Sequence, residues 1–275
     1  MAPFLAYEDK GPAAGAGSAA GEGSAAAEGY AALPLVLVHG HPFDHTMWAP
    51  QIAELSRTRR VIAPDLRGYG ASPVVPGVTL LSDFAADVAT LLDDLKVPEF
   101  ALAGLSMGGQ IVMDFYAQFP ERVRALILAD TFPRAETPEG VRTREAMAER
   151  LLAEGMTGYA DEVLYKMVAP YAEPEVAAHV RKMMTATDPR GAAAALRGRA
   201  QRPDYSDLLT RVTVPTLVVV GRDDTFTPVS DAEAMHTALP NSTLSVIEGA
   251  AHLPNLERAG EFNGVLGAFL AELGL

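Results

Sequence analysis

The sequence predicts an α/β fold in which a mainly parallel sheet is covered on both faces by helices. Strand-like apolar runs alternate with helix-like segments up to about residue 130 and again from residue 216 onwards, and such alternation is typical of parallel strands joined by helical crossovers. The order of strand, Gly104-Leu105-Ser106-Met107-Gly108 and helix is a second observation, because it places a serine on a sharp turn at a strand end. The third is residues 137–205, which contain four helix-like segments and no convincing strand.

Local patterns predict the elements of the first half. Leu33–His39 is a mostly apolar run that ends at Gly40, as expected of a buried strand. Leu80–Leu95 carries apolar residues at helical spacing, and Pro120 ends the helix that begins after the serine. By the same reasoning, strands are predicted at Phe4–Tyr7, Leu33–His39, Arg60–Ala63, Phe100–Ala103 and Val123–Leu128, and helices at His45–Ser56, Leu80–Leu95 and Met107–Phe119.

Residues 11–29 are an Ala-, Gly- and Ser-rich tract without apolar periodicity. A segment of this composition cannot bury much apolar surface, so we expect a flexible surface loop. A hairpin strand hidden near this tract would bring the sheet to eight strands, and the helical segment would then follow the sixth.

The second half holds the helical segment and then a return to alternation, with strands at Thr216–Val220 and Thr243–Ile247 and helices at Ser230–Ala238 and Glu257–Leu273. Within residues 137–205, prolines mark the helix boundaries at Pro138, Pro170, Pro174, Pro189 and Pro203. Ligands bind at the carboxyl ends of the strands in open α/β sheets. Because the segment is short and both its ends return to the sheet, residues 137–205 are predicted to be a helical cap or lid on a core of residues 1–136 and 206–275, rather than an independent domain.

Composition excludes several classes of function. The chain has no cysteine, which rules out disulfides, thiolate metal sites and a cysteine nucleophile and favours a reducing, cytoplasmic location. A net charge of −13 argues against a nucleic-acid partner. No apolar run reaches the ~18 residues of a membrane span, and no signal-peptide pattern precedes the first strand. Nothing in the sequence indicates a metal or organic cofactor, and the oligomeric state is unknown from sequence.

A serine nucleophile needs a base, and the base needs an orienting acid. Asp223 and Asp224 directly follow one late strand, and His252 follows the next. A serine, an acid and a histidine at three strand ends therefore predict nucleophilic catalysis by Ser106. Asp130 also follows a strand and is a third candidate acid, although a role in capping the entry to the helical segment is favoured for it. The backbone N–H of Met107, directly after the serine, is expected to bind the oxyanion.

Four motifs give the chain a family resemblance from about residue 30 to its end. They are His39-Gly40-His41-Pro42, Asp65-Leu66-Arg67-Gly68-Tyr69-Gly70-Ala71-Ser72, Gly104-Leu105-Ser106-Met107-Gly108-Gly109 and Ala251-His252-Leu253-Pro254-Asn255-Leu256-Glu257. This set resembles the α/β-hydrolases that include bacterial carboxylesterases, 3-oxoadipate enol-lactonases and cofactor-free haloperoxidases or perhydrolases. The resemblance implies the α/β-hydrolase fold, with an eight-stranded sheet, and the order of nucleophile, acid and histidine.

The resemblance also implies individual roles. The pattern G-x-x-D-x-x-x-P, running from Gly221 to Pro228, selects Asp224 over Asp223 as the triad acid. The HGxP motif implies that the backbone N–H of His41 is the second oxyanion donor and that the His41–Pro42 peptide bond is cis.

Serine at position 106 favours acyl transfer, whereas related enzymes with an aspartate there act at saturated carbon. The predicted function is hydrolysis of small to medium carboxylic esters through an acyl-enzyme. Alternatives are an enol-lactone hydrolase, a perhydrolase or haloperoxidase side activity suggested by Pro42, and, more distantly, a non-catalytic ligand-binding protein. C–C bond hydrolases and hydroxynitrile lyases share the same three residues.

Large apolar side chains near the site and in the cap could line a permissive substrate pocket. The candidates are Phe43, Trp48, Phe132, Met147 and Met167. Ordinary core packing is an equally good interpretation of each. The basic residues of the cap, which include Arg142, Arg144, Arg181, Lys182, Arg197 and Arg199, are expected to be mostly solvated, although an enol-lactonase would use one or two cations for its substrate carboxylate.

Overall fold

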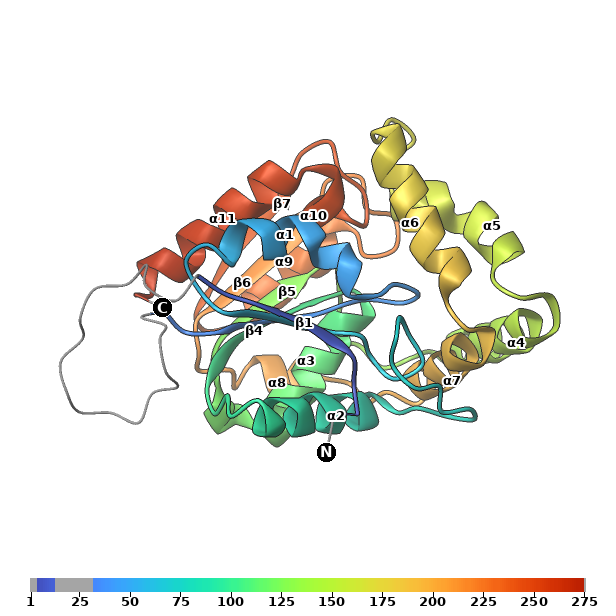
Figure 1. The fold of residues 1–275 in the computed structure, drawn as a ribbon, viewed down its shortest axis with the longest axis horizontal. Helices are drawn as coiled ribbons and strands as arrows, with labels where there is room; N and C mark the ends of the chain where they lie inside the picture. The colour runs from blue at the N-terminus through green and yellow to red at the C-terminus, as the bar shows by residue number, and fades with distance from the viewer. Residues whose placement is uncertain (1–3, 13–31, 275) are drawn as a thin grey trace.

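A computed structural model describes residues 4–12 and 32–274. Within these ranges seven strands form one sheet in the order β1-β3-β2-β4-β5-β6-β7 (Figure 1). Strand β1 pairs with β3 in antiparallel register, and every other neighbouring pair is parallel, which confirms the mainly parallel sheet. The strands are β1 (Tyr7–Lys10), β2 (Leu35–Val38), β3 (Val61–Pro64), β4 (Phe100–Leu105), β5 (Val123–Ala129), β6 (Thr216–Gly221) and β7 (Ser242–Ile247).

One detail of the predicted sheet differs. Strand β1 runs from Tyr7 to Lys10, whereas the sequence predicts a strand over Phe4–Tyr7. The eighth strand and the flexible loop predicted near residues 11–29 lie outside the described residues, apart from residues 11 and 12. Among the strands that are described, the helical segment follows β5, the fifth along the chain.

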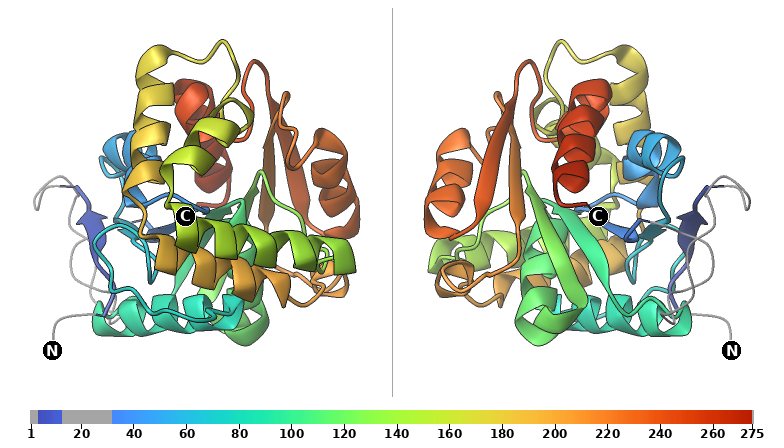
Figure 2. Two further views of the ribbon diagram at one scale, coloured as in Figure 1. Left: turned by 90° about the vertical axis from the view of Figure 1, so that its right-hand side faces the viewer. Right: turned by 90° about the vertical axis from the view of Figure 1, so that its left-hand side faces the viewer.

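Helices cover both faces of the sheet (Figures 1 and 2), so the central strands are buried on both sides. In β2, Val36 and Val38 contribute to one core, and Leu35 and Leu37 contribute to the other, as the two-residue period of a strand requires. The first core lies under α2 (Leu81–Asp94), α3 (Met107–Gln118), α8 (Ser206–Leu209) and α9 (Val229–Ala238). The second lies under α1 (Ala49–Leu55) and α11 (Ala259–Glu272), with short η1 (His45–Trp48), η2 (Pro120–Arg122) and α10 (Pro254–Glu257) completing the connections.

The helical segment consists of four helices at one end of the sheet, on the right in Figure 1. They are α4 (Pro138–Glu154), α5 (Thr157–Met167), α6 (Pro174–Ala186) and α7 (Pro189–Ala200). Three of them begin with the prolines that the sequence singled out, since proline suits the first helical position. Thr137 and Asp188 cap α4 and α7 by accepting backbone N–H groups. Helices α4 and α7 pack on each other through a small core that includes Ala148, Leu151 and Leu196.

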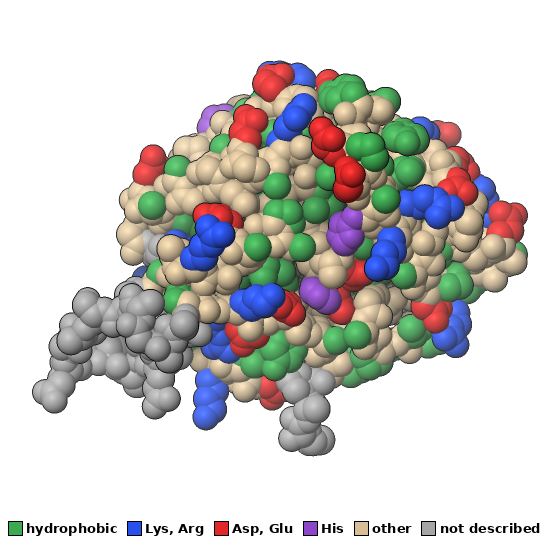
Figure 3. All heavy atoms as spheres, turned by 45° about the horizontal axis from the view of Figure 1, so that its top comes forward, with side chains coloured by type: hydrophobic (Ala, Val, Ile, Leu, Met, Phe, Trp, Pro, Cys, Tyr) green, Lys and Arg blue, Asp and Glu red, His purple; other side chains and the backbone are tan. Residues whose placement is uncertain are grey.

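The face shown in Figure 3 carries acidic and basic side chains interspersed with apolar ones. Within the described part of the chain, no helix combines the length and apolar character needed to cross a bilayer.

Candidate active site

Ser106 lies at the end of the central strand β4, directly before α3. Its backbone has φ 59° and ψ −116°, a conformation that non-glycine residues rarely adopt and that is often found at functional sites. The residue is 9% exposed and lines a pocket. The Thr131 hydroxyl donates to Ser106 O at 2.8 Å and so braces the turn from the end of β5.

Two glycines allow this turn because backbone approaches within it. A Cβ at Gly104 would lie 2.2 Å from Gly108 O, and a Cβ at Gly108 would lie 2.2 Å from Val38 O. Both distances are far inside van der Waals contact. The strand, the turn and the helix can therefore pack together only with glycine at these two positions.

His252 and Asp224 are brought together although 28 residues separate them. His252 Nδ1 lies 2.7 Å from Asp224 Oδ2, and both residues are buried. Burial alone would raise the pKa of Asp224, but the nearby His252 and hydrogen bonds from Thr227 outweigh burial and hold that pKa below its ordinary value. Asp224 is therefore ionised at neutral pH and can stabilise a positive imidazole.

The other two candidate acids are placed differently. The Tyr171 hydroxyl donates to Asp223, in an exposed pair away from His252. Asp130 is buried beside the site, where its Oδ1 accepts the Gly221 N–H at 2.9 Å and its Oδ2 has no hydrogen-bond partner in residues 4–12 and 32–274. Burial, together with the charge of Asp224, raises the pKa of Asp130 well above its ordinary value and so favours the neutral carboxyl.

The loop after β2 runs directly against the serine. A Cβ at Gly40 would lie 3.2 Å from Ser106 Cβ, and the His41–Pro42 peptide bond is cis, as the resemblance implied. His39 holds this loop, since its Nδ1 lies 2.8 Å from Gly40 O and its Nε2 accepts the Leu66 N–H at 2.9 Å. The resemblance implies that the His41 N–H is an oxyanion donor. The Met107 N–H lies in the first turn of α3, where backbone N–H groups have no intrahelical acceptors.

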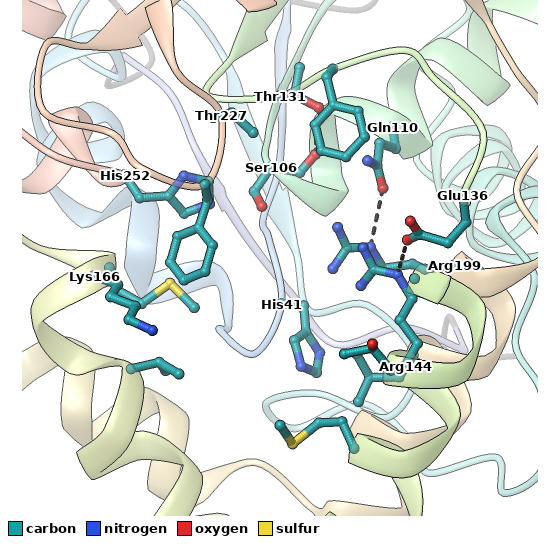
Figure 4. A pocket seen from close by; sticks show the side chains of 18 of the residues that line it. His41, Ser106, Gln110, Thr131, Glu136, Arg144, Lys166, Arg199, Thr227 and His252 are labelled. Atoms are coloured by element: carbon teal, nitrogen blue, oxygen red, sulfur yellow. Dashed lines mark hydrogen bonds and ion pairs between the residues drawn. The ribbon is translucent and has the colours of Figure 1, made fainter. Parts of the chain in front are cut away.

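A pocket of about 640 Å³ opens at the serine. Ser106, His41 and His252 line it together with predicted wall residues Phe132, Met147 and Met167, and Figure 4 shows the labelled residues around the cavity. The predicted roles of Phe43 and Trp48 are wrong: neither lines the pocket, and both are fully buried in the core beneath α1 and α11. Their large apolar surfaces are removed from water by the sheet and helices, which explains their positions.

Sequence reasoning gave no role to two residues that shape the site. Glu257 accepts the N–H groups of Ala251 at 2.9 Å and Ala169 at 2.7 Å, so it links the His252 loop to the segment that follows α5. Gln110 lines the pocket one helical turn after Ser106, and the four-residue spacing on a helix was a signal that could have found it.

Among the residues that the structure describes, two groups of acidic and histidine side chains have oxygen and nitrogen atoms within 4.8 Å of one another, namely Asp44, His45 and Asp65, and Asp130, Asp224 and His252. In the first group Asp65 Oδ1 accepts the His45 N–H at 2.8 Å, and Asp44 Oδ1 accepts the Thr46 N–H at 2.8 Å. These hydrogen bonds give the carboxylates a role in holding the loops after β2 and β3 without an ion.

Comparison with known proteins agrees with this geometry. The family description alpha/beta hydrolase fold matches residues 34–259. A 3-oxoadipate enol-lactonase from Acinetobacter baylyi is 30% identical over 228 residues, covering 82% of this chain and 84% of that protein. A pimeloyl-acyl-carrier-protein methyl ester esterase from Aliivibrio salmonicida is 31% identical over 245 residues, covering 86% and 91%. The solved structure of a thermophilic esterase from Thermogutta terrifontis superposes with a TM-score of 0.90 at 37% identity, covering 98% and 94% of the two chains. This chain therefore belongs to the α/β-hydrolase fold family.

Proposed function

We propose that the protein is a serine hydrolase that cleaves carboxylic esters of small to medium size through an acyl-enzyme. The observation that carries the proposal is the arrangement of three residues. Ser106 has a strained backbone and lines the same pocket as His252, and His252 Nδ1 is paired with the ionised Asp224. Two relatives with esterase names and one with an enol-lactonase name support cleavage of an ester bond.

In this mechanism His252 takes the proton of Ser106 as the hydroxyl oxygen attacks the carbonyl carbon of the ester. Asp224 holds the imidazole with a proton on Nδ1 and stabilises its positive charge. The backbone N–H groups of His41 and Met107 bind the oxyanion, and loss of one such donor costs about 10²–10³ in rate in comparable enzymes. His252 returns its proton to the departing alcohol, and water then hydrolyses the acyl-enzyme by the same steps.

The four helices of residues 137–205 are proposed to be the cap of this site. Support comes from the pocket itself, because Met147 of α4, Tyr159 and Met167 of α5, and Arg199 of α7 all line it. A cap that supplies one wall of the cavity would exclude bulk water from the reacting ester.

The test compares the wild type with Ser106→Ala on 4-nitrophenyl acetate, butyrate and octanoate. Removal of the nucleophile from another serine hydrolase lowers turnover by about 10⁶, so Ser106→Ala is expected to reduce hydrolysis to the background rate. Labelling by a fluorophosphonate at Ser106 alone, confirmed by mass spectrometry, is the matching positive result. Near-normal turnover by Ser106→Ala would reject the assignment, and absence of both labelling and turnover in the wild type would favour the non-catalytic alternative.

Hydrolysis of an enol-lactone is the second candidate. Enol-lactonases from Acinetobacter baylyi and Burkholderia xenovorans are among its relatives, the second with a TM-score of 0.84 at 29% identity over 97% of this chain and 96% of that one. A butenolide tested beside an aryl ester of similar size would rank the two activities. The perhydrolase side activity and the cytoplasmic location stay predictions from sequence.

A further inference from the structure

The pocket beside Ser106 contains buried hydrogen-bond donors for which the described protein provides no acceptor. Arg199 is 8% exposed, donates its Nε–H to Gln110 Oε1 at 3.1 Å, and forms no ion pair with any residue of ranges 4–12 and 32–274. A guanidinium can only donate, so Gln110 must turn its oxygen towards Arg199 and its NH₂ group away. That Gln110 Nε2 is buried and has no partner in the described chain, and the same holds for His41 Nε2.

Three arginines, Arg144, Arg199 and Arg202, lie close enough at this wall of the pocket for their charges to interact. Burial lowers the pKa of Arg199 well below its ordinary value, and the nearby charges of Arg144 and Arg202 lower it further. Glu136 pairs with Arg144 and Arg202, so this neighbouring carboxylate is already engaged by two other guanidinium groups. A buried cation without a counter-ion is costly, and a bound anion would offset that cost.

The unpartnered donors lie close to the nucleophile. Gln110 lies in the first turn of α3, its backbone N–H donates to Ser106 O at 3.2 Å, and both residues line the pocket. Figure 4 shows Gln110 and Arg199 together on one side of the cavity, with Lys166 on the opposite side. A short carbon chain can span the distance between an ester carbonyl at Ser106 and an anion at Arg199.

We propose that Arg199 and Gln110 form a subsite for a substrate carboxylate located a few carbon atoms from the carbonyl that Ser106 attacks. The favoured substrates are then half-esters or lactones of dicarboxylic acids. The planar fork of a guanidinium matches the two oxygens of a carboxylate, which gives the subsite selectivity as well as affinity. This inference rests on the proposed function and narrows its substrate class.

The test uses two esters that differ in charge, 4-nitrophenyl hydrogen adipate and its methyl ester. Wild-type kcat/KM is expected to be at least tenfold higher for the acid. Arg199→Met keeps the length of the side chain without its charge and is expected to lower kcat/KM for the acid by about 10- to 100-fold more than kcat/KM for the methyl ester, as loss of a charged hydrogen bond does. Arg142→Met, at an exposed arginine of α4 that does not line the pocket, is the control for net charge.

A second variant tests the subsite with Arg199 in place, so its result does not depend on the folding of Arg199→Met. Gln110→Glu puts a carboxylate against Arg199 without removing it, and this internal counter-ion should abolish the preference for the acid. The subsite is overturned if the wild type cleaves the two esters equally well, or if Arg199→Met slows both to the same extent. If the wild type cleaves neither ester faster than Ser106→Ala does, the proposed function fails. Calorimetry with adipate then tests the subsite separately. Binding that is at least tenfold weaker in Arg199→Met supports the subsite, and no binding to the wild type refutes it.

Discussion

Glu136 holds together the arginines behind the pocket, and its charge is expected to make the fold sensitive to acid. It pairs with Arg202 Nη1 at 2.9 Å and with Arg144, and its own side chain is 12% exposed. Burial alone would raise the pKa of Glu136, but these two arginines lower it from 4.5 to about 2. At full strength such a change corresponds to about 3.4 kcal/mol of stability, and solvent screening near the pocket rim reduces our expectation to about 2 kcal/mol.

The perturbation is Glu136→Gln, which keeps the shape and removes the charge. Because the folded pKa is depressed, the ionised carboxylate stabilises the fold above pH 4.5, and this contribution is lost as the pH falls towards 2. Urea unfolding followed by circular dichroism should therefore show the variant less stable than wild type by about 2 kcal/mol at pH 7, with a difference that shrinks between pH 5 and pH 3.

Glu145→Gln is the matched control for that measurement. Glu145 pairs with Arg197 at 2.9 Å, but its side chain is 52% exposed. The substitution should therefore lower the free energy of unfolding by less than about 1 kcal/mol at both pH 5 and pH 3. A stability difference for Glu136→Gln that is independent of pH, or no larger than that of Glu145→Gln, would show that the arginine cluster does not depend on this carboxylate.

Three further outcomes are expected. Gly108→Ala places a Cβ 2.2 Å from Val38 O, so we expect a loss of about 3 kcal/mol or more in urea unfolding, and unchanged stability would contradict the packing described for the turn. Asp224→Asn should lower kcat by about 10⁴ through the wrong imidazole tautomer with little change in melting temperature; a rate within tenfold of wild type would exclude Asp224 as the orienting acid. Asp130 has a raised folded pKa, so the wild type loses stability as the pH rises above the unfolded value of 3.8. Asp130→Asn should therefore gain stability relative to wild type between pH 4 and pH 7, and a gap that stays constant over this range argues against a raised pKa for Asp130.

Many of the strands and helices could be predicted from the sequence, because the pattern that indicates each of them spans only a few neighbouring residues. Apolar runs gave β2, β4 and β6, and proline at the first helical position gave the starts of α4, α6 and α7. The sharp turn at Ser106 could be recognised for the same reason, since Gly104, Ser106 and Gly108 lie within five residues of one another in the sequence. Strand β1 was harder, because a short edge strand is defined by its antiparallel partner β3 more than by its own residues.

Residues that are neighbours in the chain were enough to predict the order of elements, the serine on its turn, and the acid and histidine that follow later strands. The direction in which each side chain points could be seen only in the folded molecule, because packing between distant segments sets it. On α7, Arg197 reaches exposed Glu145 and Glu149, whereas Arg199, two residues later, turns into the pocket, as about 200° of helical rotation allows. Composition cannot distinguish these two arginines, nor can it separate pocket-lining Phe132 from core-buried Phe43.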